Sequence, residues 1–202
     1  MIDIDKSNGL WTVTLNRPDK ANALTTEMLE ELVTIAEDAT EAHGFILTGA
    51  GKVFSAGADL DAAKAGLATS DVWERLSSAI AMIPCLTIAA LNGTLAGGAN
   101  GMALACDIRI AVPTAKIFYP VMKLGYRPQP SDPIRMSTLI GPSRTKLVLM
   151  AGQKITAQDA LTYGLIDKIV EPDDLITTAH DLLKDSVAAD PQLVQEIKAM
   201  ID

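Results

Sequence analysis

Two short stretches of small residues are the parts of this sequence best suited to chemistry performed by the backbone. Ser55–Leu60 reads SAGADL, and Ala96–Gly101 reads AGGANG. Side chains this small leave backbone N–H groups within reach of a ligand. If Gly97 and Gly98 open a short helix, the first N–H groups of that helix lack partners within it. One N–H group from each stretch, converging on one oxygen, would form an oxyanion hole for a carbonyl that becomes an enolate or a tetrahedral adduct.

Close packing of a helix against a strand accounts for the same small residues equally well. The composition of the chain narrows the class of protein. The chain has 202 residues, of which 49% are hydrophobic, and this suits one folded domain and excludes a disordered chain. A formal net charge of −8 argues against a nucleic-acid or anionic membrane surface.

The sequence has few residues that could bind a metal and no segment typical of a secreted protein. Two cysteines and two histidines are too few for a disulfide framework or a His-rich metal site. The chain has no run of 18 apolar residues, and its first residues do not resemble a signal peptide. We therefore expect a cytoplasmic protein with no metal.

Strand and helix patterns alternate along the chain, which predicts an α/β fold. Residues 2–15 read as a hairpin that turns at Asn8-Gly9, and the last helix should begin at Asp190-Pro191. The small-residue stretch should form a turn and a short helix. Further strands are expected at 44–49, 85–93, 107–112 and 165–170, and further helices at 25–38, 71–83, 141–152 and 156–164.

Five blocks of sequence follow one another in an order and spacing that resemble one family. They are LNRPDKANAL (15–24), LTGAGKVFSAGADL (47–60), AALNGTLAGGANGMALACDIRIA (89–111), AKIFYPVMKLG (115–125) and LVLMAGQKITAQDALTYGLIDKIV (147–170). The chain is identified by these blocks, which cover most of it, as a member of the enoyl-CoA hydratase/isomerase family, also called the crotonase superfamily.

The resemblance implies a crotonase-like spiral of β-β-α units followed by C-terminal helices. It implies a single domain over residues 1–202, with a spiral core at 1–172 and a helical segment at 173–202. In a departure from the family pattern, we expect a C-terminus shorter than usual. It further implies a homotrimer or hexamer, an acyl-CoA thioester as ligand, and no cofactor apart from the coenzyme A of the substrate. The activity implied is that of a lyase or isomerase of fatty acid metabolism.

The resemblance also assigns residues to the site. The N–H groups of Ala58 and Gly98 would form the oxyanion hole for the thioester carbonyl. The residues expected along the coenzyme A are Lys20, Ala21, Ala56, Asp59 and Leu60, although the family aspartate at position 59 supports its loop instead of doing chemistry.

Both acids that a hydratase of this family usually carries are missing. The frame that usually reads GGGCELALACD reads GGANGMALACD here, so Gly101 stands in the first glutamate position. The frame that usually reads AKFGLPEVKLG reads AKIFYPVMKLG here, so Val121 stands in the second. General acid–base catalysis needs a titratable group within hydrogen-bond reach, so ordinary hydratase activity should be weak or absent.

Asp132 is the first candidate for an acid or base that replaces the two missing glutamates. It lies in the loop that usually faces the acyl group. Its competing interpretation is strong, because an aspartate before Pro133 makes a good helix N-cap. Tyr119 and Tyr126 flank the second vacant position and read more simply as pocket walls. Asn100 either orients a water molecule or caps the short helix.

The remaining polar candidates have structural interpretations that outweigh the chemical ones. Asp71 and Glu74 read as the solvated face of a helix. Cys106 and Asp107 read as a buried thiol and a turn-forming carboxylate, and Arg135 reads as structural.

Two functions from different classes remain. The first is an enzyme that stabilises a thioester enolate at Ala58 and Gly98. The alternative is a non-catalytic acyl-CoA-binding or regulatory homologue, which the vacancies at Gly101 and Val121 favour. RNA binding, known among some family members, is disfavoured by the net charge of −8 and the lack of a basic run.

Overall fold

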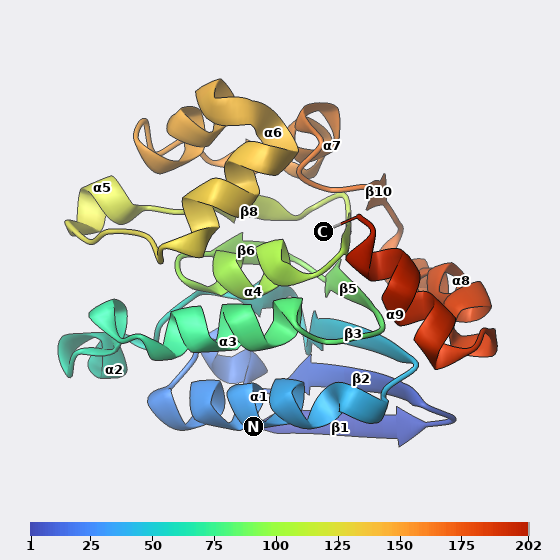
Figure 1. Ribbon diagram of the computed structural model, residues 1–202. Helices are drawn as coiled ribbons and strands as arrows, with labels where there is room; N and C mark the ends of the chain where they lie inside the picture. Colours follow the sequence, from blue (N-terminus) through green and yellow to red (C-terminus); the bar gives the residue numbers. More distant parts are fainter. Residues whose placement is uncertain (202) are drawn as a thin grey trace.

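Successive β-β-α units stack along the chain. The first strand pair, β1 and β2, lies wholly in the larger of two sheets, and each later pair adds one strand to each sheet. The computed structural model describes residues 1–201. In Figure 1 the chain rises from β1 and β2 at the bottom to α6 and α7 at the top, with α8 and α9 at one side. The strands are β1 (Ile2–Ser7), β2 (Leu10–Leu15), β3 (Gly44–Gly49), β4 (Val53–Ser55), β5 (Leu86–Leu91), β6 (Thr94–Ala96), β7 (Ile108–Ala111), β8 (Lys116–Phe118), β9 (Ile155–Thr156) and β10 (Lys168–Ile169).

Helices follow the strand pairs and pack against the apolar faces that the strands present. They are α1 (Thr26–Asp38), α2 (Leu60–Lys64), α3 (Val72–Ala81), α4 (Ala99–Ala105), α5 (Val121–Leu124), α6 (Ser131–Leu149), α7 (Ala157–Tyr163), α8 (Leu175–Ala188) and α9 (Pro191–Ala199). Short 3-10 turns lie at Pro18–Lys20, Ala39–Glu41, Leu67–Thr69 and Pro172–Asp174.

The first hairpin confirms the sequence prediction in detail. Asn8 and Gly9 both adopt positive φ, at 55° and 79°, as a two-residue hairpin turn requires. Strands β1 and β2 pair antiparallel with Ser7 opposite Leu10. Val13 and Leu15 are fully buried, so one face of the hairpin is committed to the core.

The larger sheet has the order β1-β2-β3-β5-β7-β10, and its strands from β2 onward run parallel. Parallel strands buried on both faces need apolar residues throughout, and β3 shows five consecutive buried residues. The predicted α/β class is confirmed. The observed strands at β5, β7 and β10 are shorter than expected, because their predicted ends belong to the connecting turns.

The smaller sheet positions the candidate site. Its order is β4-β6-β8-β9, with β4, β6 and β8 parallel. The segments that follow parallel neighbouring strands emerge at one edge of a sheet, and here these are the residues after Ser55, Ala96 and Phe118. The turn and short helix expected after Ala96 are confirmed by Gly97 and α4.

Helix α6 differs from the sequence prediction. The expected helix at 141–152 is the second half of a longer element that starts at Ser131 and is kinked at Gly141, where φ is 78° and ψ is 162°. It ends at Leu149 and not at Gly152. Helix α7 does end at a glycine, Gly164, as predicted.

The last helix, α9, begins where the sequence predicts. The Asp190 carboxylate accepts a hydrogen bond from the Gln192 N–H at 2.8 Å, and Pro191 occupies the first turn of α9. The division of the chain at residue 172 stays a prediction, and Asp202 lies outside the described residues. Across residues 1–201, no helix is long and apolar enough to cross a membrane.

Candidate active site

The two glycine-rich loops meet at Gly57 and Gly97. Both residues have positive φ, at +88° and +60°, a conformation that favours glycine. A Cβ atom at Gly57 would lie only 2.9 Å from the carbonyl oxygen of Ala96, and one at Gly97 would lie 3.6 Å from the Gly57 Cα. The small residues are therefore required for the loops to touch, as the packing interpretation proposed, and the contact also brings Ala58 toward Gly98.

The N–H group of Ala58 is left free by the way its loop pairs with Leu24. The Leu24 N–H donates to the Gly57 carbonyl at 2.8 Å, and the Asp59 N–H donates to the Leu24 carbonyl at 2.8 Å. The intervening N–H of Ala58 points away from this pairing. Within residues 1–201, neither this N–H nor that of Gly98 is given a hydrogen-bond acceptor by the protein.

Asp59 supports its loop with both carboxylate oxygens. Its Oδ2 accepts a hydrogen bond from the Arg17 guanidinium at 2.8 Å, while its Oδ1 accepts from the N–H groups of Asp61 at 3.0 Å and Ala62 at 3.4 Å. The hydrogen bond from Arg17 is the largest cause that lowers the pKa of Asp59. The carboxylate caps α2 and fixes the backbone beside Ala58.

The other residues expected along the coenzyme A lie on one accessible strip. The Ala56 N–H donates to the Ala21 carbonyl at 3.0 Å, which joins the first loop to the turn that holds Lys20. Lys20 and Ala56 are exposed, and Leu60 has 78% of its surface exposed although it is apolar. The structure therefore brings this expected set together at the surface.

Asn100 links the second loop to β8. Its side-chain amide donates to the carbonyl of Gly97 at 2.8 Å and to that of Phe118 at 3.1 Å. Both amide protons are thus used within the protein, so the structure supports the interpretation of Asn100 as a structural residue of the turn.

Asp132 is the buried acid of this region. It has 0% of its surface exposed, and the Tyr119 hydroxyl donates to its Oδ2 at 2.8 Å. Its Oδ1 is buried without a hydrogen-bond partner in the part of the chain that the structure describes. A Cβ atom at Gly101 would lie 2.7 Å from this oxygen, so the carboxyl occupies the space that a side chain at position 101 would enter.

The expected N-cap role of Asp132 is wrong. Helix α6 begins at Ser131 after the N-cap residue Pro130, so Asp132 lies inside the first turn and does not cap the helix. The Asp132 side chain points instead toward α4. Burial is the largest cause that raises the pKa of Asp132, to about 6, and the hydrogen bond from Tyr119 opposes that rise.

The start of α6 is tied to α3 around this carboxyl. Glu74 accepts hydrogen bonds from the Ser131 N–H at 3.2 Å and from the Ser131 hydroxyl at 3.0 Å. The Arg135 guanidinium donates to the hydroxyls of Ser131 and Ser77. The expectation that Glu74 belongs to a solvated face is therefore wrong, whereas Asp71 is exposed and Arg135 is structural as expected.

The second vacant position is closed by apolar and aromatic residues. Val121 and Tyr119 are each 5% exposed, so both belong to the core, and Tyr126 is 41% exposed outside it. Burial is the largest cause that raises the pKa of Tyr119, so its hydroxyl keeps its proton and acts as a donor to Asp132.

Trp73 is a site residue that the sequence analysis missed. A Cβ atom at Gly98 would lie 3.1 Å from its ring, and its indole N–H donates to the Leu67 carbonyl at 2.8 Å. The ring is thus fixed beside the N–H group of Gly98. In the sequence, Trp73 lies on the apolar face of a predicted helix, so it looks like any other core residue and its place beside the site could not be predicted.

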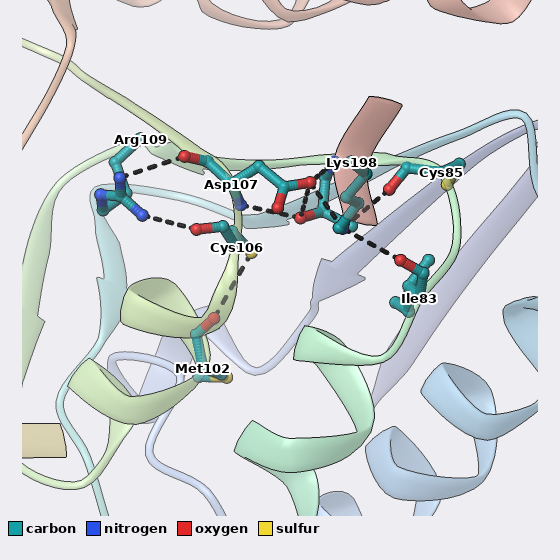
Figure 2. Close-up of polar contacts among 8 residues, drawn as sticks. Ile83, Cys85, Met102, Cys106, Asp107, Arg109 and Lys198 are labelled. Carbon is teal, nitrogen blue, oxygen red and sulfur yellow. Dashed lines mark hydrogen bonds and ion pairs between the residues drawn. The ribbon is translucent and has the colours of Figure 1, made fainter. Parts of the chain in front are cut away.

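A second polar cluster lies at the other end of α4 (Figure 2). The Asp107 Oδ2 accepts hydrogen bonds from the Thr87 N–H at 2.8 Å, the Thr87 hydroxyl at 2.9 Å and the Lys198 ammonium at 2.7 Å. Lys198 also donates to the carbonyls of Ile83 and Cys85, both at 3.0 Å. Asp107 is therefore structural, as expected.

The two thiols near this cluster, Cys85 and Cys106, are unreactive because burial keeps them protonated. Burial is the largest cause that raises the pKa of Cys85 and of Cys106 to about 12. The Cys106 thiol donates to the Met102 carbonyl at 3.4 Å. The expectation of a buried thiol at position 106 is confirmed.

Comparison with known proteins identifies the family of this chain. Residues 5–202 match the sequence profile of the enoyl-CoA hydratase/isomerase family. A short-chain-enoyl-CoA hydratase of Clostridium acetobutylicum is 34% identical over 98% of this chain and 80% of its own. The ethylmalonyl-CoA decarboxylase of Mus musculus is 30% identical over 98% of this chain and 65% of its own.

Solved structures of enoyl-CoA hydratases have the same fold. The enoyl-CoA hydratase of Bacillus anthracis superimposes with a TM-score of 0.88 at 31% identity, over 99% of this chain and 81% of its own. An enoyl-CoA hydratase subunit of Geobacillus kaustophilus gives a TM-score of 0.89 at 28% identity, over 99% of this chain and 80% of its own.

Proposed function

Because the chain belongs to the enoyl-CoA hydratase/isomerase family and has the crotonase fold, we propose that it is an enzyme acting on acyl-CoA thioesters through the backbone N–H groups of Ala58 and Gly98. The observation that carries this proposal is the junction of the two loops at Gly57 and Gly97. It brings together two segments whose N–H groups at positions 58 and 98 are left without acceptors in residues 1–201.

Two such donors stabilise a charge that develops during reaction. When a base removes the hydrogen on the carbon next to a thioester carbonyl, the negative charge moves onto the carbonyl oxygen. Donors that are already oriented strengthen their hydrogen bonds to that oxygen without reorganising. The cap by Asp59 and the amide of Asn100 supply this rigidity, because each fixes the backbone next to one donor.

Recognition of the coenzyme A rests on the exposed strip at Lys20, Ala21, Ala56 and Leu60. Lys20 provides an ammonium group for a phosphate, and Leu60 provides an apolar surface for the pantetheine chain. Most of the remaining contacts come from the backbone, so the net charge of −8 is no obstacle. Asp59 contributes through its loop, since Arg17 already neutralises its carboxylate.

The two vacant acid positions limit the reaction. Hydration of an enoyl thioester needs one group to take a proton from water and another to deliver one to carbon. Gly101 and Val121 supply neither, so hydration of crotonyl-CoA should be slow. We also propose assembly as a homotrimer or hexamer, as the family resemblance implies, and a cytoplasmic location.

The decisive experiment compares two substitutions at Gly98. Gly98→Pro removes the N–H group, and the φ of −59° at this position suits proline. Gly98→Ala keeps the N–H group and adds the same Cβ atom beside Trp73, so it is the matched control. If Gly98 donates to the thioester, the proline variant should lose about 10²–10³-fold in turnover relative to the alanine variant.

Calorimetry completes the test. Butyryl-CoA should bind the wild-type protein more tightly than butyrate, because only the thioester reaches both the loops and the coenzyme A strip. Equal binding of the acid and the thioester, or equal turnover by two folded Gly98 variants, would refute the proposal.

A further inference from the structure

We propose that Asp132 is the group that carries a proton to and from the thioester substrate, and that Tyr119 positions it for this task. The inference rests on the proposed function, because it assumes that the thioester carbonyl binds at Gly98. It adds the acid–base residue that the two vacant positions leave unassigned, and it narrows the reaction to one that a single carboxyl can perform.

The first argument is the space that Asp132 fills. Its Oδ1 lies 2.7 Å from the position of a Cβ atom at Gly101, so the carboxyl in its present position leaves no room for a side chain there. Side chains on a helix lean toward its N-terminus, so the space next to Gly101 faces the Gly98 end of α4. A carboxyl from α6 has thus entered the region that a side chain at position 101 would serve.

The second argument is that only one of the two carboxyl oxygens of Asp132 has a hydrogen-bond partner. The Tyr119 hydroxyl holds Oδ2 at 2.8 Å, whereas Oδ1 has no partner in residues 1–201. A buried carboxyl oxygen without a hydrogen bond is costly and rare, and such groups gather at functional sites. Tyr119 therefore leaves one defined oxygen available and fixes the direction in which it points.

The third argument is reach. Gly98 and Gly101 lie one helical turn apart, with the Gly101 N–H donating to the Gly98 carbonyl at 3.0 Å. Three residues of helix span about 4.5 Å along the axis. A carbonyl oxygen bound by the Gly98 N–H has the carbon next to the carbonyl two bonds away, so the proposal places that carbon about one helical turn from the Asp132 Oδ1.

The chemistry balances with one carboxyl and no further reactant. Oδ1 takes a hydrogen from the carbon next to the carbonyl as a proton, and the C–H electron pair forms the enolate whose charge rests on the oxygen. Protonated Asp132 then returns the proton to the same carbon, which gives exchange, or to the far carbon of a 3-enoyl thioester, which gives the 2-enoyl isomer. Addition of water would require a second group, and position 121 offers only valine.

The charges around Asp132 set the pH at which it works. It is faced by Tyr119 before α5, by Glu74 on α3 and by Arg135 on its own helix. Burial and the charge of Glu74 raise its pKa, and Tyr119 and Arg135 lower it, which leaves a value of about 6. The carboxylate that removes a proton thus predominates above about pH 6, so the rate should rise through that pH.

Substrate entry requires movement, because Asp132 is fully buried. The stretch at residues 122–127 is exposed throughout and joins Val121 to the segment before α6. Among the surrounding segments it can move with the least loss of packing.

The experiment uses 3-butenoyl-CoA in deuterated water and follows its conversion to crotonyl-CoA together with deuterium in the product. The wild-type protein should convert it, and Asp132→Asn should be about 10²–10⁴-fold slower with unchanged binding of butyryl-CoA. Asp181→Asn, on the exposed face of α8, is the matched control and should behave as wild type.

The outcomes separate the two proposals. If the thioester binds but Asp132→Asn keeps the wild-type rate, or the wild type neither isomerises nor exchanges hydrogen, the role of Asp132 is overturned and thioester binding stands. If no thioester binds, both proposals fail.

Tyr119→Phe tests positioning by a readout that a merely structural role would not move. Loss of the hydroxyl removes a cause that lowers the pKa of Asp132, so the midpoint of the pH–rate profile should shift upward. The carbon-13 signal of the labelled Asp132 carboxyl should shift its titration midpoint in the same direction, even without substrate. Tyr163→Phe on α7 is the control, and an unchanged midpoint in Tyr119→Phe would overturn the positioning role.

Discussion

Asp107 and Asp132 border the same short helix, α4, and differ in how the protein uses their oxygens. Asp107 follows the helix, and its Oδ2 accepts three hydrogen bonds, one of them from Lys198. Asp132 lies beside the middle of the helix, and its Oδ1 has no partner in residues 1–201. A carboxylate oxygen that accepts three hydrogen bonds contributes to stability, whereas a buried oxygen without a partner costs stability and is free to react.

The burial of the two residues reinforces this distinction. The side chains of Asp107 and Lys198 are 23% and 14% exposed, so the Asp107 carboxylate has both a counter-charge at 2.7 Å and access to water. Asp132 has no exposed surface, and its pKa is raised to about 6. The same substitution, aspartate to asparagine, should therefore change stability in opposite directions at the two positions.

Asp107→Asn should have the largest effect on stability, a loss of about 3 kcal/mol. Removing one partner of a largely buried ion pair leaves the other charge uncompensated, and Lys198 retains only the two carbonyls. Chemical denaturation at pH 7 measures this loss, with Asp181→Asn as control. Isomerisation by the folded variant should remain near the wild-type rate, and a loss of activity like that of Asp132→Asn would break the comparison.

Asp132→Asn should raise stability at pH 7 by about 2 kcal/mol. A pKa raised from 3.8 to about 6 sets an upper limit of about 3 kcal/mol on the cost of the buried charge. Burying the new amide group has its own desolvation cost, which offsets part of the gain. A variant less stable than the wild type at pH 7 would show that Asp132 is a structural residue.

The pH dependence sharpens the same prediction. An acid whose pKa is raised on folding binds its proton more tightly in the folded state, so stability falls as pH rises between 3.8 and about 6. The cost is absent well below pH 3.8 and complete above about pH 6. The stability difference between Asp132→Asn and the wild type should follow that window.

Thr87→Val should have the smallest effect, a loss of about 1 kcal/mol. The buried Thr87 hydroxyl donates to the Asp107 carboxylate and accepts from the Asp107 N–H, both at 2.9 Å, and valine makes neither hydrogen bond. Thr34→Val on the exposed face of α1 is the control. A loss as large as that of Asp107→Asn would mean that Thr87, more than Lys198, holds the carboxylate in place.

Local signals predicted much of the fold. Asn8-Gly9 specified the hairpin, since both residues take positive φ. The apolar spacing of residues 25–38 predicted α1, whose Met28, Leu29, Leu32, Val33 and Ile35 are all buried. The kink at Gly141 was not predictable in this way, because the glycine joins two helical patterns as readily as it separates them.

The site was predictable where it depends on the backbone and less so where it depends on packing. Small residues at 57–58 and 97–98 signalled the loops directly. Asp132 precedes a proline, and that local signal favoured a cap over the contact it makes with α4. Its proximity to Gly101, 31 positions earlier in the chain, follows from how α6 crosses α4 and leaves no mark in either segment.

The 2.7 Å approach between the Gly101 Cβ position and the Asp132 carboxyl also constrains how this arrangement could have arisen. A glutamate at 101 and an aspartate at 132 compete for one space, so the two residues should co-vary among relatives, with an acid at one position and a small residue at the other. A mutational path between the two states passes through an overcrowded intermediate or through one that lacks both carboxyls. Gly101→Glu in the present chain creates the overcrowded one, so an engineered return to a glutamate at 101 must first replace Asp132 with a small residue.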